Sequence, residues 1–116
     1  MTLIHKPWGC YTDYFRGKHV VFKRLDIDTS ESISYQYHDH RDELWYVVSG
    51  MGLLTVDDVV STVESGDSVF INKGQKHKIE CTSRTSLVIY EMQMGEPTED
   101  DIVRLEDKYG RIDNET

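Results

Sequence analysis

The sequence predicts an all-β protein that ends in one short helix. Short runs rich in Val, Ile, Tyr and Phe recur along the chain with turn-forming residues between them. Within 19–28, apolar and polar residues alternate with the period of two expected of a half-buried strand. Evenly spaced short strands of this kind are typical of a sandwich or barrel. At 116 residues, the chain is the size of one domain, and we expect that domain to cover 1–116.

Turn signals divide the chain into successive elements. Asp57-Asp58 separates two strand-like runs and predicts a hairpin, and 72–74 (Asn-Lys-Gly) predicts another turn. After "SLVIYEMQMG" the period changes, and 97–110 predicts a helix with Thr98 as N-cap, acidic residues in its first turn and Gly110 as its stop. The predicted strands cover 19–28, 32–40, 43–50, 53–58, 59–67, two short segments of 68–81, and 86–95.

Composition excludes several classes of partner. The net charge is −8, with 21 acidic and 13 basic residues, and the basic residues form no stripe. Nucleic acid and anionic membranes are therefore poor partners, although a few local Arg or Lys can still bind an anionic small molecule. No apolar run approaches the roughly 20 residues that span a bilayer, and no signal-peptide layout occurs, so we expect a cytoplasmic location. Cys10 and Cys81 form no CxxC pair and are interpreted as ordinary buried thiols.

The stretch 34–50, "SYQYHDHRDELWYVVSG", places many polar groups within strand-forming sequence. Because side chains alternate along a strand, Gln36, His38 and His40 share one face. Glu43 follows just beyond a turn. One interpretation is a polar row that faces solvent, and the other is a set of ligands that point inward to a cation.

Glu43 shares the face of its predicted strand with Trp45, which favours a pocket over solvent. A carboxylate in an apolar pocket must be paired or must bind a cation, because burying it bare costs too much. Imidazole, carboxylate and amide oxygen together suit one divalent transition metal, with zinc as the first choice and Mn, Fe, Co or Ni as alternatives. His77, which follows a glycine turn and shares its face with Ile79, is the best candidate for a further ligand.

Two ordered sets of residues resemble the two-part motif of the cupins, namely Gln36-x-His38-x4-Glu43-x6-Gly50 and Gly66-x5-Asn72-x-Gly74-x2-His77. Together with "KPWG" (6–9) and "EDDIVRLEDKYGR" (99–111), the chain resembles the C-terminal domain of type II phosphomannose isomerase/mannose-1-phosphate guanylyltransferase. The resemblance runs from about Lys6 to Arg111. It implies a double-stranded β-helix, a jelly-roll-like barrel that holds a metal inside.

The resemblance also implies roles for single residues. The metal ligands would be Gln36, His38, Glu43 and His77. Gln36 stands where most cupins have His, which leaves His40 as a second-choice ligand or as a residue that lines the site.

Arg41 and Arg104 fall on basic positions of the family pattern and could hold a phosphate, because guanidinium forks do this well. The alternative for each is an ion pair with a neighbouring Asp. Lys18 could help to bind the phosphate, although a solvated surface position is the more ordinary expectation. His40 would be the general base if it faces the cavity and binds no metal. An unassigned carboxylate or a metal-bound hydroxide would otherwise serve.

These residues point to a sugar phosphate as the small-molecule partner. The function implied is metal-dependent interconversion of mannose 6-phosphate and fructose 6-phosphate. The alternative is a non-catalytic sugar- or sugar-phosphate-binding module, and a third possibility is another cupin enzyme such as a metal dioxygenase. The nucleotidyltransferase half and a glycine-rich phosphate loop are absent from the sequence, so guanylyl transfer is not expected. A homodimer is expected by resemblance, since it would also cover an edge strand.

Overall fold

The computed structural model describes residues 1–111, and over that range it contains eleven β-strands and no helix. The all-β class predicted from the sequence is confirmed. Nothing in residues 1–111 is a helix long and apolar enough to cross a membrane. The strands are β1 (Thr2–Lys6), β2 (Gly9–Arg16), β3 (Val20–Ile27), β4 (Tyr35–Tyr37), β5 (Arg41–Ser49), β6 (Met51–Val56), β7 (Val59–Glu64), β8 (Ser68–Ile71), β9 (His77–Cys81), β10 (Leu87–Gly95) and β11 (Val103–Glu106).

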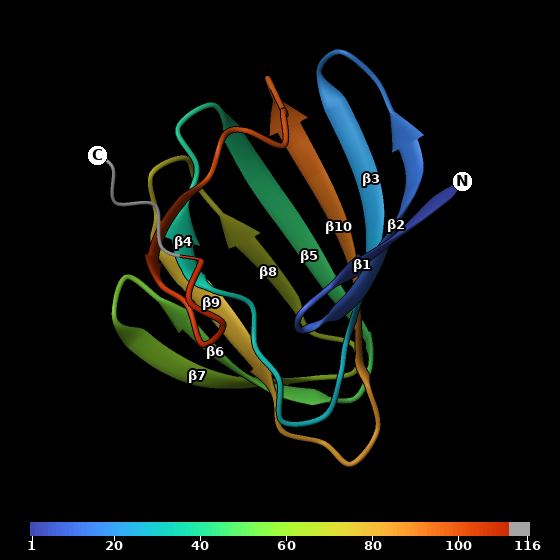
Figure 1. The fold of residues 1–116 in the computed structure, drawn as a ribbon, viewed down its shortest axis with the longest axis vertical. Helices are drawn as coiled ribbons and strands as arrows, with labels where there is room; N and C mark the ends of the chain where they lie inside the picture. The colour runs from blue at the N-terminus through green and yellow to red at the C-terminus, as the bar shows by residue number, and fades with distance from the viewer. Residues whose placement is uncertain (112–116) are drawn as a thin grey trace.

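The strands form two antiparallel sheets. The first sheet has the order β1-β2-β3-β10-β5-β8, and the second has the order β11-β4-β9-β6-β7. In Figure 1, β10 lies between β3 and β5, although it comes near the end of the chain. The inner faces of these three strands therefore meet side by side, and they supply much of the candidate site.

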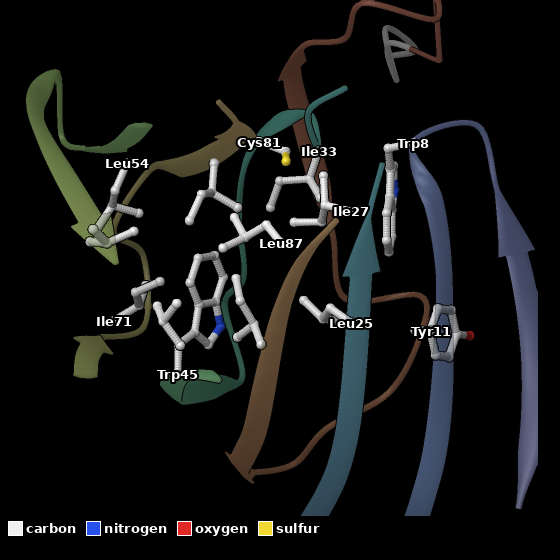
Figure 2. Close-up of a cluster of buried hydrophobic side chains, with 14 residues drawn as sticks. Trp8, Tyr11, Leu25, Ile27, Ile33, Trp45, Leu54, Ile71, Cys81 and Leu87 are labelled. Carbon is white, nitrogen blue, oxygen red and sulfur yellow. The ribbon is translucent and has the colours of Figure 1, made fainter. Parts of the chain in front are cut away.

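Hydrophobic side chains from both sheets pack into one buried cluster. Figure 2 shows Trp45 beside Leu87 in this cluster, with Trp8 and Tyr11 on the side where β2 lies. Trp8 is packed in the interior, where it is 7% exposed. Cys81 is fully buried and Cys10 is half-buried, and both are free thiols.

The interior changes from apolar to polar along the strands. Ile89 of β10 lies in register with Leu25 and Val47, so this row across the sheet is apolar. The next inward row places Glu91 between Lys23 and Trp45. The row after that places Gln93 opposite Glu43. One part of the interior is thus a hydrophobic core, and the other is lined by buried polar groups.

The helix predicted over 97–110 is wrong. Residues Val103–Glu106 form β11, which pairs with β4. The backbone groups at the edge of β4 require partners, and a short isolated helix gains too little from its own hydrogen bonds to compete with this pairing. Thr98 does not cap a helix, since its carbonyl accepts a hydrogen bond from Nη1 of Arg41 at 3.0 Å. Figure 1 shows the chain after β10 crossing to the side of β4.

Two turns follow the predictions, and one hairpin was not predicted. The hairpin turn at Asp57-Asp58 is confirmed, with positive φ angles of 47° and 68° between β6 and β7. The turn at 72–74 also separates two strands, but β8 and β9 lie in different sheets. The β1–β2 hairpin extends the first sheet, and at Gly9 a Cβ atom would lie 2.0 Å from the Asp26 carbonyl oxygen, so only glycine fits there.

Candidate functional site

The structure brings three of the predicted metal ligands together. His38 directly follows β4, Glu43 is on β5, and His77 begins β9. One ligand atom from each lies within 4.8 Å of the others. The shortest approach joins His38 Nε2 and Glu43 Oε2 at 3.2 Å, and His77 Nε2 lies 3.8 Å from Glu43 Oε1. All three residues are buried, so the alternative of a polar row in solvent does not describe them.

Backbone carbonyls set the orientation of both imidazole rings. His38 Nδ1 lies 2.6 Å from the carbonyl oxygen of Asp101, and His77 Nδ1 lies 2.9 Å from that of Gln75. A carbonyl only accepts hydrogen bonds, so Nδ1 carries the proton in each ring. Each Nε2 then presents its lone pair toward Glu43. Burial lowers the pKa of His38 to about 4, which keeps this ring neutral near pH 7.

Glu43 is a buried anion with close partners. Its Oε2 accepts from Nε of Arg41 at 2.8 Å, and its Oε1 accepts from Nε1 of Trp45 at 3.0 Å. Burial opposes ionisation, but it is outweighed by His38, which is protonated at the low pH where Glu43 titrates, and by the Arg41 guanidinium, which is charged throughout, and together they lower the pKa of Glu43 to about 2. The carboxylate is therefore charged at neutral pH. The ion pair expected for Arg41 is present, although its partner is Glu43 rather than the adjacent Asp42.

The residues present fit the metal that the resemblance implies. Nε2 of His77 is buried and has no hydrogen-bond partner among the described residues. A buried nitrogen lone pair beside a buried carboxylate is costly unless a proton or cation lies between them. Two imidazoles and one carboxylate form a donor set that zinc and its neighbours accept. The site can therefore hold a divalent transition metal through His38, Glu43 and His77.

Gln36 lies on β4 with its backbone in register with His77, and it lines the same cavity as His38 and Glu43. It is 8% exposed. Its role as a further ligand stays a prediction.

His40 and Lys18 lie elsewhere. Both side chains are exposed, and neither lines the cavity at the site. His40 meets the site only through its backbone, because its N–H donates to Oδ2 of Asp101 at 2.8 Å. The condition under which His40 would act as general base, that it faces the cavity, is not met in this structure.

A cavity of about 140 Å³ opens beside the predicted ligands, and its lining is rich in basic groups. The five basic residues are Lys6, Lys23, Arg41, Arg104 and Arg111, against three acidic residues, Glu43, Glu91 and Glu99. This local excess of positive charge stands against the net charge of −8 for the whole chain. Such a cavity favours an anionic ligand.

Arg104 lies on β11 opposite Gln36 and lines the cavity, as a phosphate-binding role would require. Two of the acidic residues near it in sequence also contact other groups. Asp107 holds Arg111, with Nε of the arginine 2.7 Å from Oδ2, and Asp101 accepts from two backbone N–H groups.

Sequence reasoning missed Lys23, Glu91, Glu99 and Arg111 as site residues. For Lys23 a signal was present, because alternation over 19–28 places it on the face of Val21 and Leu25, which is the buried face. A buried lysine needs a partner, and its Nζ lies 2.9 Å from Oε2 of Glu99. Glu99 and Arg111 come later in the chain than the strands from which the site was inferred. No strand periodicity predicted that their side chains would line the site.

Glu91 lies on β10 and is a second buried carboxylate within the cavity lining. Its oxygens accept from Nε1 of Trp45 at 3.0 Å and from Nε2 of Gln93 at 2.8 Å. Burial and the negative charge of Glu43 raise the pKa of Glu91 to about 8. Trp45 thus bridges a charged carboxylate and one that holds its proton.

Comparison with known proteins gives the family context. The family described as "Mannose-6-phosphate isomerase C-terminal" matches residues 1–107. The chain is 34% identical over 110 residues to mannose-1-phosphate guanylyltransferase ManC of Salmonella typhimurium, and 37% identical over 109 residues to xanthan biosynthesis protein XanB of Xanthomonas campestris. These matches cover 94% and 93% of this chain but 23% of each relative. The chain therefore spans less than a quarter of the length of these relatives.

Solved structures show the same fold. CapF of Staphylococcus aureus matches with a TM-score of 0.76 at 20% identity, covering 90% of this chain and 34% of that one. The cupin domain of Schizosaccharomyces pombe Cnp3 matches with a TM-score of 0.75 at 9% identity, covering 83% and 69%. An RmlC-like cupin from Shewanella frigidimarina matches with a TM-score of 0.74 at 19% identity, covering 85% and 86%. The double-stranded β-helix of the cupins, predicted from the motif, is confirmed.

Proposed function

Because the chain belongs to the family of mannose-6-phosphate isomerase C-terminal domains, we propose that it is a metal-dependent isomerase that interconverts mannose 6-phosphate and fructose 6-phosphate. One observation carries the proposal: His38, Glu43 and His77 converge within 4.8 Å beside a cavity lined by basic residues. The convergence supports a metal site, and the basic lining supports binding of an anionic sugar.

The phosphate would bind among the basic groups of the cavity. Arg104 and Arg111 come from the segment after β10, and Lys6 comes from β1. Guanidinium groups pair with phosphate oxygens through two parallel hydrogen bonds, so Arg104 suits this role, whereas Nε and Nη2 of Arg111 already contact Asp107. Arg41 as a phosphate ligand stays a prediction, because its donors already contact Glu43 and the Thr98 carbonyl.

Isomerisation moves a proton between C1 and C2 of the sugar, so a group in the cavity must accept and return it. Glu91, in the fraction of molecules in which it is ionised, is the unassigned carboxylate best placed for this, because it is buried, lines the cavity and is held by Trp45 and Gln93. Trp45 and Gln93 would fix the direction of its oxygens. A metal held by His38, Glu43 and His77 would polarise the sugar carbonyl as a Lewis acid. Trp8 and Tyr11 would cover the apolar faces of the sugar and exclude water.

A non-catalytic sugar-phosphate-binding module is the second candidate. The observation that favours it is the share of the relatives covered, because the activities named for ManC and XanB belong to proteins of which this chain matches 23%. Fold and family alone do not fix catalysis. Both candidates use the same basic cavity and differ in turnover.

The test combines metal analysis with a turnover assay. We expect about one transition-metal ion per purified chain, and formation of fructose 6-phosphate from mannose 6-phosphate that a chelator abolishes. Glu43→Gln should lose both metal and turnover, whereas Glu64→Gln, which removes the same charge from an exposed position on β7, should keep both. Metal with no turnover would favour the binding module. A protein that binds neither a metal nor a sugar phosphate would contradict both candidates.

The identity of the metal stays a prediction, with zinc first. A single domain over 1–116, a homodimer and a cytoplasmic location also stay predictions from the sequence and the resemblance. Size-exclusion chromatography with light scattering would decide the dimer.

A further inference from the structure

The segment 96–102, which we call the strap, connects β10 to β11 and contacts the metal-ligand cluster. Glu99 and Ile102 of the strap line the cavity. The strap is attached to the first sheet by Glu99, whose Oε2 lies 2.9 Å from Lys23 Nζ and 2.8 Å from Nη2 of Arg16. Its remaining contacts lead to the turn that carries His38.

We propose that Asp101 is a positioning residue for the metal site, which holds the strap against the 38–40 turn so that its own carbonyl fixes the ring of His38. This inference rests on the proposed function in assuming that His38 binds a metal. Nothing in the resemblance or in the ligand motif assigns a role to this residue.

The carboxylate of Asp101 accepts two backbone hydrogen bonds from the turn. Oδ1 accepts from the N–H of Asp39 at 2.9 Å, and Oδ2 accepts from the N–H of His40 at 2.8 Å. These two N–H groups belong to the turn between β4 and β5. One side chain therefore clamps the backbone on the C-terminal side of His38.

The main chain of the same residue contacts the ring. The carbonyl oxygen of Asp101 lies 2.6 Å from His38 Nδ1. The carboxylate and the carbonyl of one residue thus hold the turn and the ring in a fixed relation. A partner on the far nitrogen of a metal-binding histidine sets the tautomer and the ring orientation, and its loss typically weakens metal binding 10–100-fold.

Two further contacts connect the strap to the same turn. Glu96 N–H donates to the His40 carbonyl at 2.8 Å, and Arg41 Nη1 donates to the Thr98 carbonyl at 3.0 Å. These contacts bring the strap near the turn, but neither of them involves His38 Nδ1. Asp101 is the strap residue that contacts this nitrogen.

His77 provides an internal reference. Its Nδ1 donates to the Gln75 carbonyl at 2.9 Å, within its own loop and without the strap. Loss of Asp101 should therefore release the ring of His38 and leave the ring of His77 in place. General destabilisation of the protein would affect both rings.

The experiment compares Asp101→Ala with Asp100→Ala, which removes the same charge from the exposed neighbouring position. The first measurement is long-range ¹H–¹⁵N NMR of the histidine rings in metal-free protein. In Asp101→Ala, His38 should lose its fixed Nδ1–H tautomer while His77 keeps it, because the contact that remains to the His38 ring, Arg41 Nη2 at 3.2 Å from Nε2, is longer than the 2.6 Å contact that is lost. The second measurement is zinc binding by calorimetry after removal of metal by a chelator. Zinc affinity should fall 10–100-fold in Asp101→Ala and stay within about twofold in Asp100→Ala.

Asp101→Asn is the conservative variant, because it keeps the shape and one good acceptor. It should keep the Nδ1–H tautomer of His38 and recover most of the zinc affinity. If the alanine variant does not fold, Asp101→Asn is compared with wild type in its place. Unchanged zinc affinity with an unchanged His38 tautomer in Asp101→Ala would overturn the inference, as would equal effects on His38 and His77. If wild-type protein binds neither zinc nor Mn, Fe, Co or Ni, the proposed function fails, and the tautomer measurement in metal-free protein still decides the role of Asp101.

Discussion

The guanidinium of Arg41 occupies the lone pairs of two residues that form the candidate metal site. Its Nε donates to Glu43 Oε2 at 2.8 Å, and its Nη2 lies 3.2 Å from His38 Nε2. Because Nδ1 of His38 carries the ring proton, Nη2 is the donor in the second contact. A metal would need the same lone pairs, so Arg41 and the metal compete for them.

Replacement of Arg41 should therefore separate stability from metal binding. Arg41→Gln leaves Glu43 buried without its cationic partner, and we expect the metal-free protein to lose about 3 kcal/mol of unfolding free energy. Zinc affinity should rise, because no guanidinium has to be displaced. Urea unfolding in chelator and zinc calorimetry measure the two effects. Arg84→Gln, at an exposed position, serves as the control, and a zinc affinity that falls in Arg41→Gln would contradict the competition.

Glu91→Gln tests the carboxylate proposed for proton transfer. The amide keeps the size of the side chain but removes the proton acceptor, so we expect kcat for isomerisation to fall at least about 100-fold. The zinc content should stay near that of the wild type, since Glu91 is not a proposed ligand. Steady-state kinetics with metal analysis on the same preparation measure both. The matched control is Glu80→Gln on β9, which is exposed. Full kcat in Glu91→Gln would mean that another group moves the proton.

Attachment of the strap through Glu99 should depend on pH. Burial opposes ionisation of Glu99, but hydrogen bonds and charges of Lys23 and Arg16 outweigh it and lower its pKa from 4.5 to about 2. Tyr11 and Asp13 also face this group, and neither adds positive charge. A lowered folded-state pKa contributes stability that is fully present above the unfolded value and is lost as the pH falls.

The expected window lies between pH 4.5 and about pH 2. The stability difference between wild type and Glu99→Gln should be constant from pH 7 to pH 5 and should shrink below that range. Urea unfolding of both proteins in parallel measures this difference in unfolding free energy. The effects of the other carboxylates are the same in both proteins and cancel in the difference. A difference that grows as the pH falls would show that the ion pairs of Glu99 do not stabilise the strap.

Leu87→Ala tests the apolar part of the interior. Leu87 is fully buried in register with Ile27. Truncation of such a side chain removes apolar contacts and leaves a cavity, so we expect a loss of about 3 kcal/mol of unfolding free energy. Zinc affinity should not change, because the polar rows of β10 begin at Glu91. Val60→Ala, at an exposed position on β7, should cost less than about 0.5 kcal/mol. A large loss of zinc affinity in Leu87→Ala would show that the two parts of the interior are coupled.

Local pattern was sufficient to predict most of the strands and three converging candidate ligands. Alternation over 19–28 and the turn at Asp57-Asp58 correspond directly to β3 and to the β6–β7 hairpin. The burial of Glu43 followed from its same-face neighbour Trp45. These inferences succeeded because strand period and turn chemistry act within a few residues.

Prediction from the sequence failed where pairing between distant segments determines the structure. The segment 97–110 has caps and spacing suited to a helix, but the open edge of β4 recruits it as β11. The position of His40 is set by the turn that Asp101 clamps, which no motif encodes. Glu91 entered the site because β10 lies between β3 and β5. A topology of this kind cannot be read from one strand alone.

The polar and apolar rows along β10 have a consequence for how such a chain can change over generations. Mutations at Ile89 or Leu87 would act through folding, whereas mutations at Glu91 or Gln93 would act through the polar lining of the cavity. Because the apolar and polar positions lie in separate rows of one strand, substitutions in the polar rows can change the ligand that the cavity binds while the hydrophobic core stays intact.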